Sequence, residues 1–136
     1  MNKRNTIYLM LFIGLLTFVF FMFKKTKVEY SKYAKVEVKN PKYDFGEIYL
    51  KDTINHNFIL KNISDNIFYI SKVLSGCGCT SVEYEKKIIQ NGDEIIIKTQ
   101  FIANETKLGK SKNIIIVEGN SEQGIIRLEL NGIVKK

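Results

Sequence analysis

The sequence predicts an all-β antiparallel sandwich that follows one N-terminal transmembrane helix. Three observations lead to this fold class: an uncharged apolar run near the start, alternation of polarity with a period of two after it, and turn sequences spaced by roughly the 8–12 residues typical of sandwiches. We therefore expect a signal anchor at residues 1–27, a polar juxtamembrane spacer at 28–34 and the β-sandwich domain at 35–136.

The anchor prediction depends on Thr6–Phe23, 18 residues without a charge that are bracketed by basic residues. This length reaches the lower end of what spans a bilayer. A cleaved signal peptide would carry a shorter apolar stretch, roughly 7–15 residues, followed by a small-x-small site. Here the run ends in Lys24-Lys25-Thr26-Lys27, and no cysteine follows that could serve as a lipoprotein cleavage site. We expect an uncleaved single span.

The orientation of the span does not follow from its flanking charges, because basic residues lie on both sides of it. A short N-terminal tail is easily left in the cytoplasm while the following domain is exported. We therefore expect a single-pass membrane protein whose C-terminal domain is extracytoplasmic, on the periplasmic side.

The net charge of +7 suggests nucleic-acid binding, but the position of the charges argues against it. Five of the 21 basic residues lie within residues 1–28, where there is no acidic residue. The remaining chain carries 16 basic and 14 acidic residues without a basic stripe. We expect the partners to be the membrane and a protein or envelope component, and no nucleic acid.

The strands are predicted from alternating or densely β-branched segments between turn sequences such as Asn62–Asn66 and Asn91–Asp93. Ile54, His56, Phe58 and Leu60 share one face of such a strand. About seven short strands are expected, at residues 35–38, 45–49, 53–63, 67–74, 94–101, 112–118 and 125–130, the last followed by a terminal segment at 132–134. The residues expected to be buried are Ile54, Phe58, Leu60, Ile70, Ile97, Phe101, Ile115 and Leu128.

Five stretches resemble a bacterial family known as domain of unknown function 1573. They are PKYDFGEI at 41–48, INHNFIL followed by KN, SGCGCT at 75–80, the NGDE turn, and the closing LELNG. The resemblance covers about residues 35–134. It implies an immunoglobulin-like sandwich in exported bacterial proteins, with no established biochemical role. Residues 82–87 depart from the family pattern, because they lack the prolines usual after the cysteines.

The two cysteines, Cys77 and Cys79, allow three interpretations. In an extended strand their Cα atoms would lie about 6.6 Å apart, so a disulfide requires the backbone to contract at Gly78, which glycine permits, including at positive φ. Such a bond would be labile and a poor staple, which suits redox chemistry. Two thiolates would also suit Cu(I). The third interpretation is a tight corner whose sulfurs pack as small apolar groups.

His56 is the only histidine, and it shares a face with Phe58 and Leu60, where a histidine is more often a core or rim residue than a ligand. If residues 53–61 reversed through 62–66 into 67–74, His56 would lie at the same end of the domain as the cysteines. It is therefore a candidate to modulate their thiols.

Two classes of function remain. The first is a membrane-anchored extracytoplasmic β-sandwich that acts as a binding or interaction module in the bacterial cell envelope. The alternative is a thiol-redox or copper-handling protein that uses Cys77 and Cys79. We expect neither an enzyme nor a bound cofactor, because one histidine gives no Ser-His-Asp or metal-hydrolase constellation.

Overall fold

The structure, a computed structural model, describes residues 12–16 and 33–136. The chain divides into two units, residues 1–30 and 31–136. In the first, residues 12–16 form a short helical segment. Within the described residues no helix has the length and apolar character needed to cross a membrane. Most of the predicted anchor, Thr6–Phe23, lies outside the described residues.

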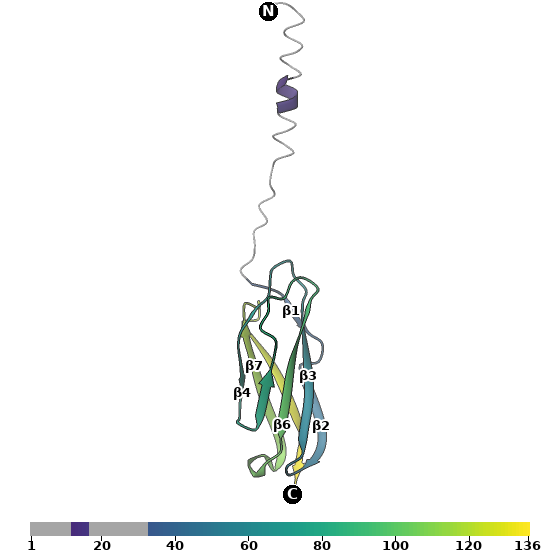
Figure 1. Ribbon diagram of the computed structural model, residues 1–136. Helices are drawn as coiled ribbons and strands as arrows, with labels where there is room; N and C mark the ends of the chain where they lie inside the picture. The colour runs from purple at the N-terminus through teal and green to yellow at the C-terminus, as the bar shows by residue number, and fades with distance from the viewer. Residues whose placement is uncertain (1–11, 17–32) are drawn as a thin grey trace, which may run out of the picture. The chain divides into compact units, whose positions relative to one another are not determined.

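The second unit is a β-sandwich of two four-stranded sheets (Figure 1). One sheet has the strand order β1-β3-β6-β5, and the other has the order β2-β8-β7-β4. This arrangement confirms the all-β sandwich class. The elements are β1 (Val36–Val38), β2 (Lys42–Tyr49), β3 (Thr53–Asn62), β4 (Ile70–Ser75), β5 (Thr80–Glu83), β6 (Glu94–Ile102), the 3-10 helix η1 (Glu105–Lys107), β7 (Gly109–Gly119) and β8 (Ile125–Lys135).

The sandwich is not purely antiparallel as predicted, because β2 pairs with β8 in parallel. These strands are distant in sequence, so no hairpin connection constrains their direction. The register between them shifts between Asp44 and Glu47, where Gly46 has a φ of 71° and its N–H donates to Asp44 Oδ1. A bulge at a glycine with positive φ explains this break in the ladder.

Two further strand predictions need correction. β5 was not expected, since Thr80–Glu83 is short and follows directly on the cysteine turn. The proposed reversal of residues 53–61 into 67–74 is wrong as well. β3 pairs with β1 and β6, whereas β4 pairs with β7 in the other sheet, so the connection between β3 and β4 crosses between the layers.

Asn62 fixes the beginning of this crossing connection. Its side chain is fully buried, and Nδ2 donates to the carbonyl oxygens of Asn66 and Ile89. Its Oδ1 accepts from the N–H and hydroxyl of Ser64. Because every polar atom of this side chain is satisfied, the buried amide holds the loop without a desolvation penalty.

The core lies between the two sheets and confirms most of the burial predictions. Of the eight residues expected inside, six are buried, while Ile54 and Ile70 are half-buried and pack against the core. The alternation on β6 is confirmed at every predicted inward position: Ile95, Ile97, Thr99 and Phe101.

Two of the family-like stretches meet inside the sandwich. Phe45 of β2 is buried, stacks on Phe101 with ring centroids 5.4 Å apart, and lies directly against Gly132 of β8. A Cβ at Gly132 would overlap both the Phe45 ring and the carbonyl oxygen of Gly46. Glycine is therefore required at this position by close approach, which is a common reason for glycine inside a strand.

Candidate functional site

The cysteine turn connects the two layers of the sandwich. It follows β4, an edge strand of one sheet, and precedes β5, an edge strand of the other. On the β4 side, the N–H of Gly76 donates to the carbonyl oxygen of Ile114 at 2.9 Å. On the β5 side, the carbonyl oxygen of Cys79 accepts from the N–H of Ile102, also at 2.9 Å. Both ends of the turn are therefore tied to central strands.

Cys77 and Cys79 form a disulfide, with Cα atoms 5.3 Å apart. This confirms the prediction that the two sulfurs lie close enough to bond through a contracted backbone. The contraction does not use a positive φ at Gly78, because Gly78 is not among the residues with positive φ. A Cβ at Gly78 would also meet nothing within 4 Å. The contraction thus places no demand on that glycine.

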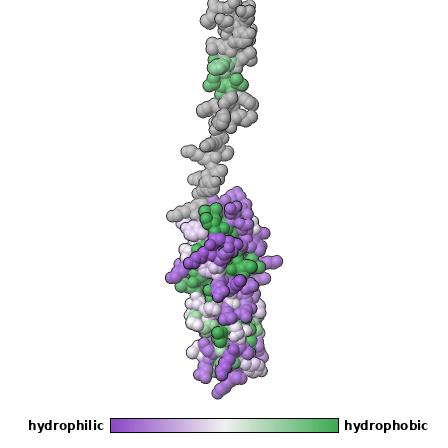
Figure 2. All heavy atoms as spheres, in the orientation of Figure 1, coloured by the Kyte–Doolittle hydropathy of each residue, from purple (hydrophilic) through white to green (hydrophobic). Residues whose placement is uncertain are grey.

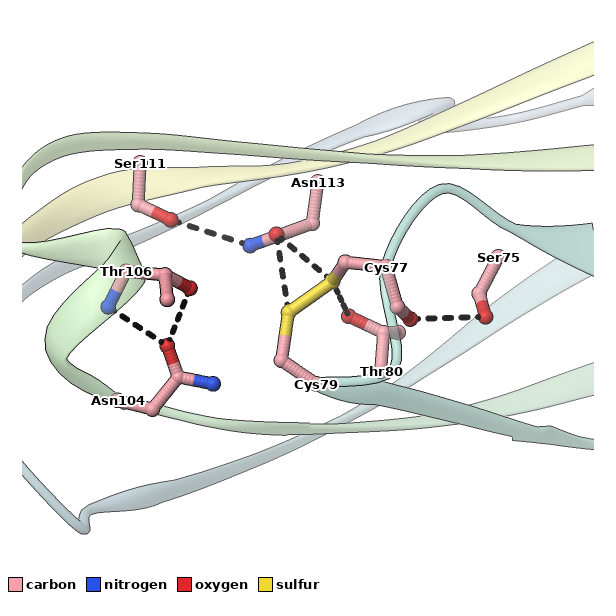
Figure 3. Close-up of a disulfide and its surroundings, with 8 residues drawn as sticks. All are labelled: Ser75, Cys77, Cys79, Thr80, Asn104, Thr106, Ser111 and Asn113. Atoms are coloured by element: carbon pink, nitrogen blue, oxygen red, sulfur yellow. Dashed lines mark hydrogen bonds between the residues drawn. A yellow bond between two sulfur atoms is a disulfide. The ribbon is translucent and has the colours of Figure 1, made fainter.

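Three buried polar side chains surround the disulfide: Thr80 on β5, and Ser111 and Asn113 on β7 (Figure 3). The Thr80 hydroxyl lies 3.6 Å from Sγ of Cys77. The side-chain oxygen of Asn113 lies 3.5 Å from Sγ of Cys77 and 3.7 Å from Sγ of Cys79. The amide nitrogen of Asn113 donates to the Ser111 hydroxyl at 3.2 Å, which turns the oxygen toward the sulfurs.

The chemistry of these contacts depends on the redox state. A sulfur in a disulfide carries no hydrogen, so in the bonded state only the Thr80 hydroxyl can donate, and its acceptor is Cys77. The Asn113 oxygen then faces two sulfurs without a shared hydrogen. A thiol is a weak donor, so reduction would create S–H groups for which this oxygen is a ready acceptor. The polar surroundings therefore fit the reduced pair as well as the disulfide.

His56 lies on the inward face of β3, as its alternation predicts, but its ring makes contacts away from the disulfide. It stacks on Tyr43 with ring centroids 3.8 Å apart and meets Phe58 edge-on at 4.6 Å. Burial lowers the pKa of His56. The hydrogen-bonding groups near the sulfurs are Thr80 and Asn113 instead. Modulation of the thiols by His56 stays a prediction.

Thr80, Ser111 and Asn113 were not among the predicted site residues. One signal was available, because Asn113 lies in phase with Ile115 and Val117, which point into the core. A polar residue at a core position of an apolar strand must find a partner there. The strand phase did not indicate that Asn113 lies beside the cysteine turn. That proximity follows from the pairing of β4 with β7, which are far apart in the sequence.

Metal binding would need the reduced form of this pair. Neither sulfur is a thiolate in the disulfide, and a thiolate is the ligand that Cu(I) prefers. Within residues 12–16 and 33–136, no three His, Cys, Asp or Glu side chains are grouped so as to hold a metal ion.

Comparisons with known proteins identify a family and a fold. The family model described as "Protein of unknown function (DUF1573)" matches residues 36–134. No curated protein matches the chain. A protein of unknown function from Porphyromonas gingivalis W83 superposes with a TM-score of 0.67 at 11% identity, over 81% of this chain and 51% of that one. The chain thus spans about half the length of that protein.

Two smaller domains are similar over nearly their whole length. The ASH/PapD-like domain 7 of human CEP192 gives a TM-score of 0.62 at 12% identity, over 82% of this chain and 93% of that domain. The WR4 protein of C. elegans, an MSP family member, gives 0.51 at 15% identity, over 74% and 99%. At these identities the likeness is one of fold alone.

Proposed function

The chain belongs to the DUF1573 family of proteins of unknown function, and we propose that it is a membrane-anchored extracytoplasmic β-sandwich that acts as a non-enzymatic binding module in the bacterial cell envelope. Two independent features support the location. Thr6–Phe23 is an uncharged run followed by lysines, without a cleavage site. The disulfide between Cys77 and Cys79 is of a kind that persists mainly in oxidising compartments, including the bacterial periplasm.

The observation that carries the binding role is an exposed apolar patch formed by Ile67, Tyr69 and Ile88. Phe68 and Ile89 form an antiparallel bridge with both side chains buried, so the residues on either side of them point outward. Continuing the antiparallel register from this bridge by one residue places Tyr69 opposite Ile88, and alternation places Ile67 on the same face. Their exposed fractions are 53% for Ile67, 47% for Tyr69 and 61% for Ile88.

Adjacent exposed apolar side chains with polar side chains around them are typical of interaction surfaces. In Figure 2, hydrophobic surface gathers in the upper half of the domain, among strongly hydrophilic side chains. A tyrosine beside two isoleucines offers a partner a large apolar contact with a polar tip. We therefore propose that the partner presents an apolar surface of an envelope protein to this patch.

Site-specific cross-linking in living cells tests the patch. A photoreactive phenylalanine analogue is placed at Tyr69, and the same analogue at Lys98, an exposed position on β6, serves as the matched control. We expect a discrete cross-linked adduct from position 69 alone, which disappears when Ile88 is changed to Ser. Equal adducts from both positions, or none from position 69, would refute the binding role of the patch.

A second candidate function is thiol–disulfide exchange, and it is favoured by the buried polar groups that touch the sulfurs of Cys77 and Cys79. Those groups suit both redox states, as a pair that cycles requires. If the candidate is correct, a mild reductant opens the bond in the folded protein and both thiols become open to alkylation. Inert sulfurs with and without reductant would remove this candidate and leave the binding module.

A further inference from the structure

We propose that Cys77 is the sulfur that forms the mixed disulfide with a partner and that Cys79 is the sulfur that leaves, with a dithiol of an exported protein as the substrate. This inference rests on the second candidate function, thiol–disulfide exchange. It assigns different roles to two cysteines that the sequence presents as equivalent. The assignment is based on what each sulfur touches.

The first asymmetry is a hydrogen bond. The Thr80 hydroxyl lies 3.6 Å from Sγ of Cys77, so its hydrogen-bond partner is Cys77 and not Cys79. A donor aimed at a sulfur favours the thiolate of that sulfur over the thiol, so it makes Cys77 the better leaving group when the mixed disulfide is broken. The Asn113 oxygen does not discriminate, because it lies 3.5 Å from one sulfur and 3.7 Å from the other.

The second asymmetry is packing. Cys79 is one of the half-buried side chains that pack against the hydrophobic core, whereas Cys77 is half-buried without belonging to that group. A partner sulfur therefore meets Cys77 first, and Cys79 is kept against apolar neighbours. Exchange rates depend on which sulfur an attacking thiolate can reach, so access and hydrogen bonding favour the same residue.

The reaction then has two balanced steps. A partner thiolate attacks Sγ of Cys77, the bond between the two cysteine sulfurs breaks, and its electron pair goes to Cys79. The Cys79 thiolate takes up the proton that the partner thiol lost and donates its S–H to the Asn113 oxygen. The second partner thiol loses its proton to solvent, and its thiolate attacks the partner's own sulfur in the mixed disulfide and releases the Cys77 thiolate, which the Thr80 hydroxyl stabilises. The partner dithiol is oxidised to a disulfide, and the cysteine pair is reduced.

Trapping of the mixed disulfide on the full chain in detergent tests the assignment. The protein is treated with reduced glutathione, quenched with acid, and fragmented by tandem mass spectrometry between Cys77 and Cys79. We expect the glutathione on Cys77. Glutathione mainly on Cys79, or equally on both, would overturn the assignment while leaving thiol exchange itself intact. A disulfide that resists glutathione and dithiothreitol in the folded protein, yet opens in denaturant, would overturn the exchange function.

The role of Thr80 has its own readout in the reduced protein. At pH 7 we expect iodoacetamide to alkylate Cys77 faster than Cys79, and Thr80→Val to slow Cys77 about three- to tenfold, as loss of one hydrogen bond to a thiolate implies. Thr80→Ser should restore the rate. Thr99→Val is the matched control, because Thr99 is equally buried but donates to the carbonyl oxygen of His56. If both valine variants slow Cys77 alike, Thr80 does not act on the sulfur.

Discussion

Replacement of Gly132 by Ala probes the contact that joins the two sheet strands β2 and β8. A Cβ at this position would overlap the Phe45 ring and the carbonyl oxygen of Gly46. The ring cannot move away without losing its stack on Phe101 and part of its burial, and the Gly46 oxygen belongs to the backbone. Forcing extra volume into a packed core costs about 1–3 kcal/mol, and exposing a buried Phe costs about 1.5–3 kcal/mol.

The two terms overlap, because a ring that is displaced relieves part of the clash. We expect a loss of about 3 kcal/mol for Gly132→Ala. A domain of this size loses roughly 4–8 °C of melting temperature per kcal/mol, so the midpoint should fall by about 12–24 °C. Thermal unfolding of the full chain in detergent, followed by far-ultraviolet circular dichroism, measures this shift.

The matched control is Gly78→Ala, since a Cβ at Gly78 meets nothing within 4 Å and its φ is not positive. Its melting temperature should stay within about 2 °C of the unmodified chain, and its disulfide should still form. If Gly132→Ala melts at the same temperature as the unmodified chain, the close approach of Phe45 is not a constraint. If both alanines destabilise equally, the reasoning from local space is refuted.

Three further predictions concern the core, the disulfide and the half-buried histidine. Phe58→Ala should cost about 3–5 kcal/mol in guanidinium unfolding, because Phe58 is fully buried between the sheets; an unchanged midpoint would contradict this. Replacing Cys77 and Cys79 together by Ser should cost at most about 2 kcal/mol in the same assay, because the closed loop is only three residues long; a larger loss would make the disulfide a structural staple. Because burial lowers the pKa of His56, the folded state favours the neutral ring. Stability should be constant above the ordinary histidine pKa and fall as pH drops through it and then through the lowered value. A pH series of melting temperatures should show this fall, and His56→Phe should abolish it while keeping the ring contacts with Tyr43 and Phe58.

The fold class could be predicted from the sequence because strand formation and the side that each strand buries depend on neighbouring residues. Alternation placed Phe58, Leu60 and the inward residues of β6 correctly, since a strand side chain can only point to one face or the other. The turn at Asn91–Asp93 was also readable, and Gly92 there has a φ of 83°. What these patterns specify is which residues form strands and which side is buried.

The pairing of strands did not follow, because it depends on contacts between distant parts of the chain. Nothing in Lys42–Tyr49 specifies that β2 runs parallel to β8, and nothing in the turn at 62–66 specifies a crossing between layers rather than a hairpin. For the same reason, only part of the candidate site could be predicted from the sequence. The spacing of Cys77 and Cys79 allowed a disulfide as one of three interpretations, whereas Asn113 reaches it only through the pairing of β4 with β7.

Four of the five stretches that resemble the family have a structural role in packing or in a turn. The cysteine turn is the exception. Phe45 of PKYDFGEI packs on Gly132 of LELNG. Asn62 of the KN pair accepts from Gly92 and donates to Asp93 of NGDE through backbone hydrogen bonds of 2.8 and 3.1 Å.

Packing and turn formation account for those four stretches. The cysteine turn is different, because Gly78 has open space around it and an ordinary φ, and a three-residue disulfide adds little stability. Besides the packing of Cys79 against the core, the sulfurs contact Thr80 and Asn113, which are polar groups that a purely structural corner would not need. This arrangement is one that the proposed thiol exchange would use.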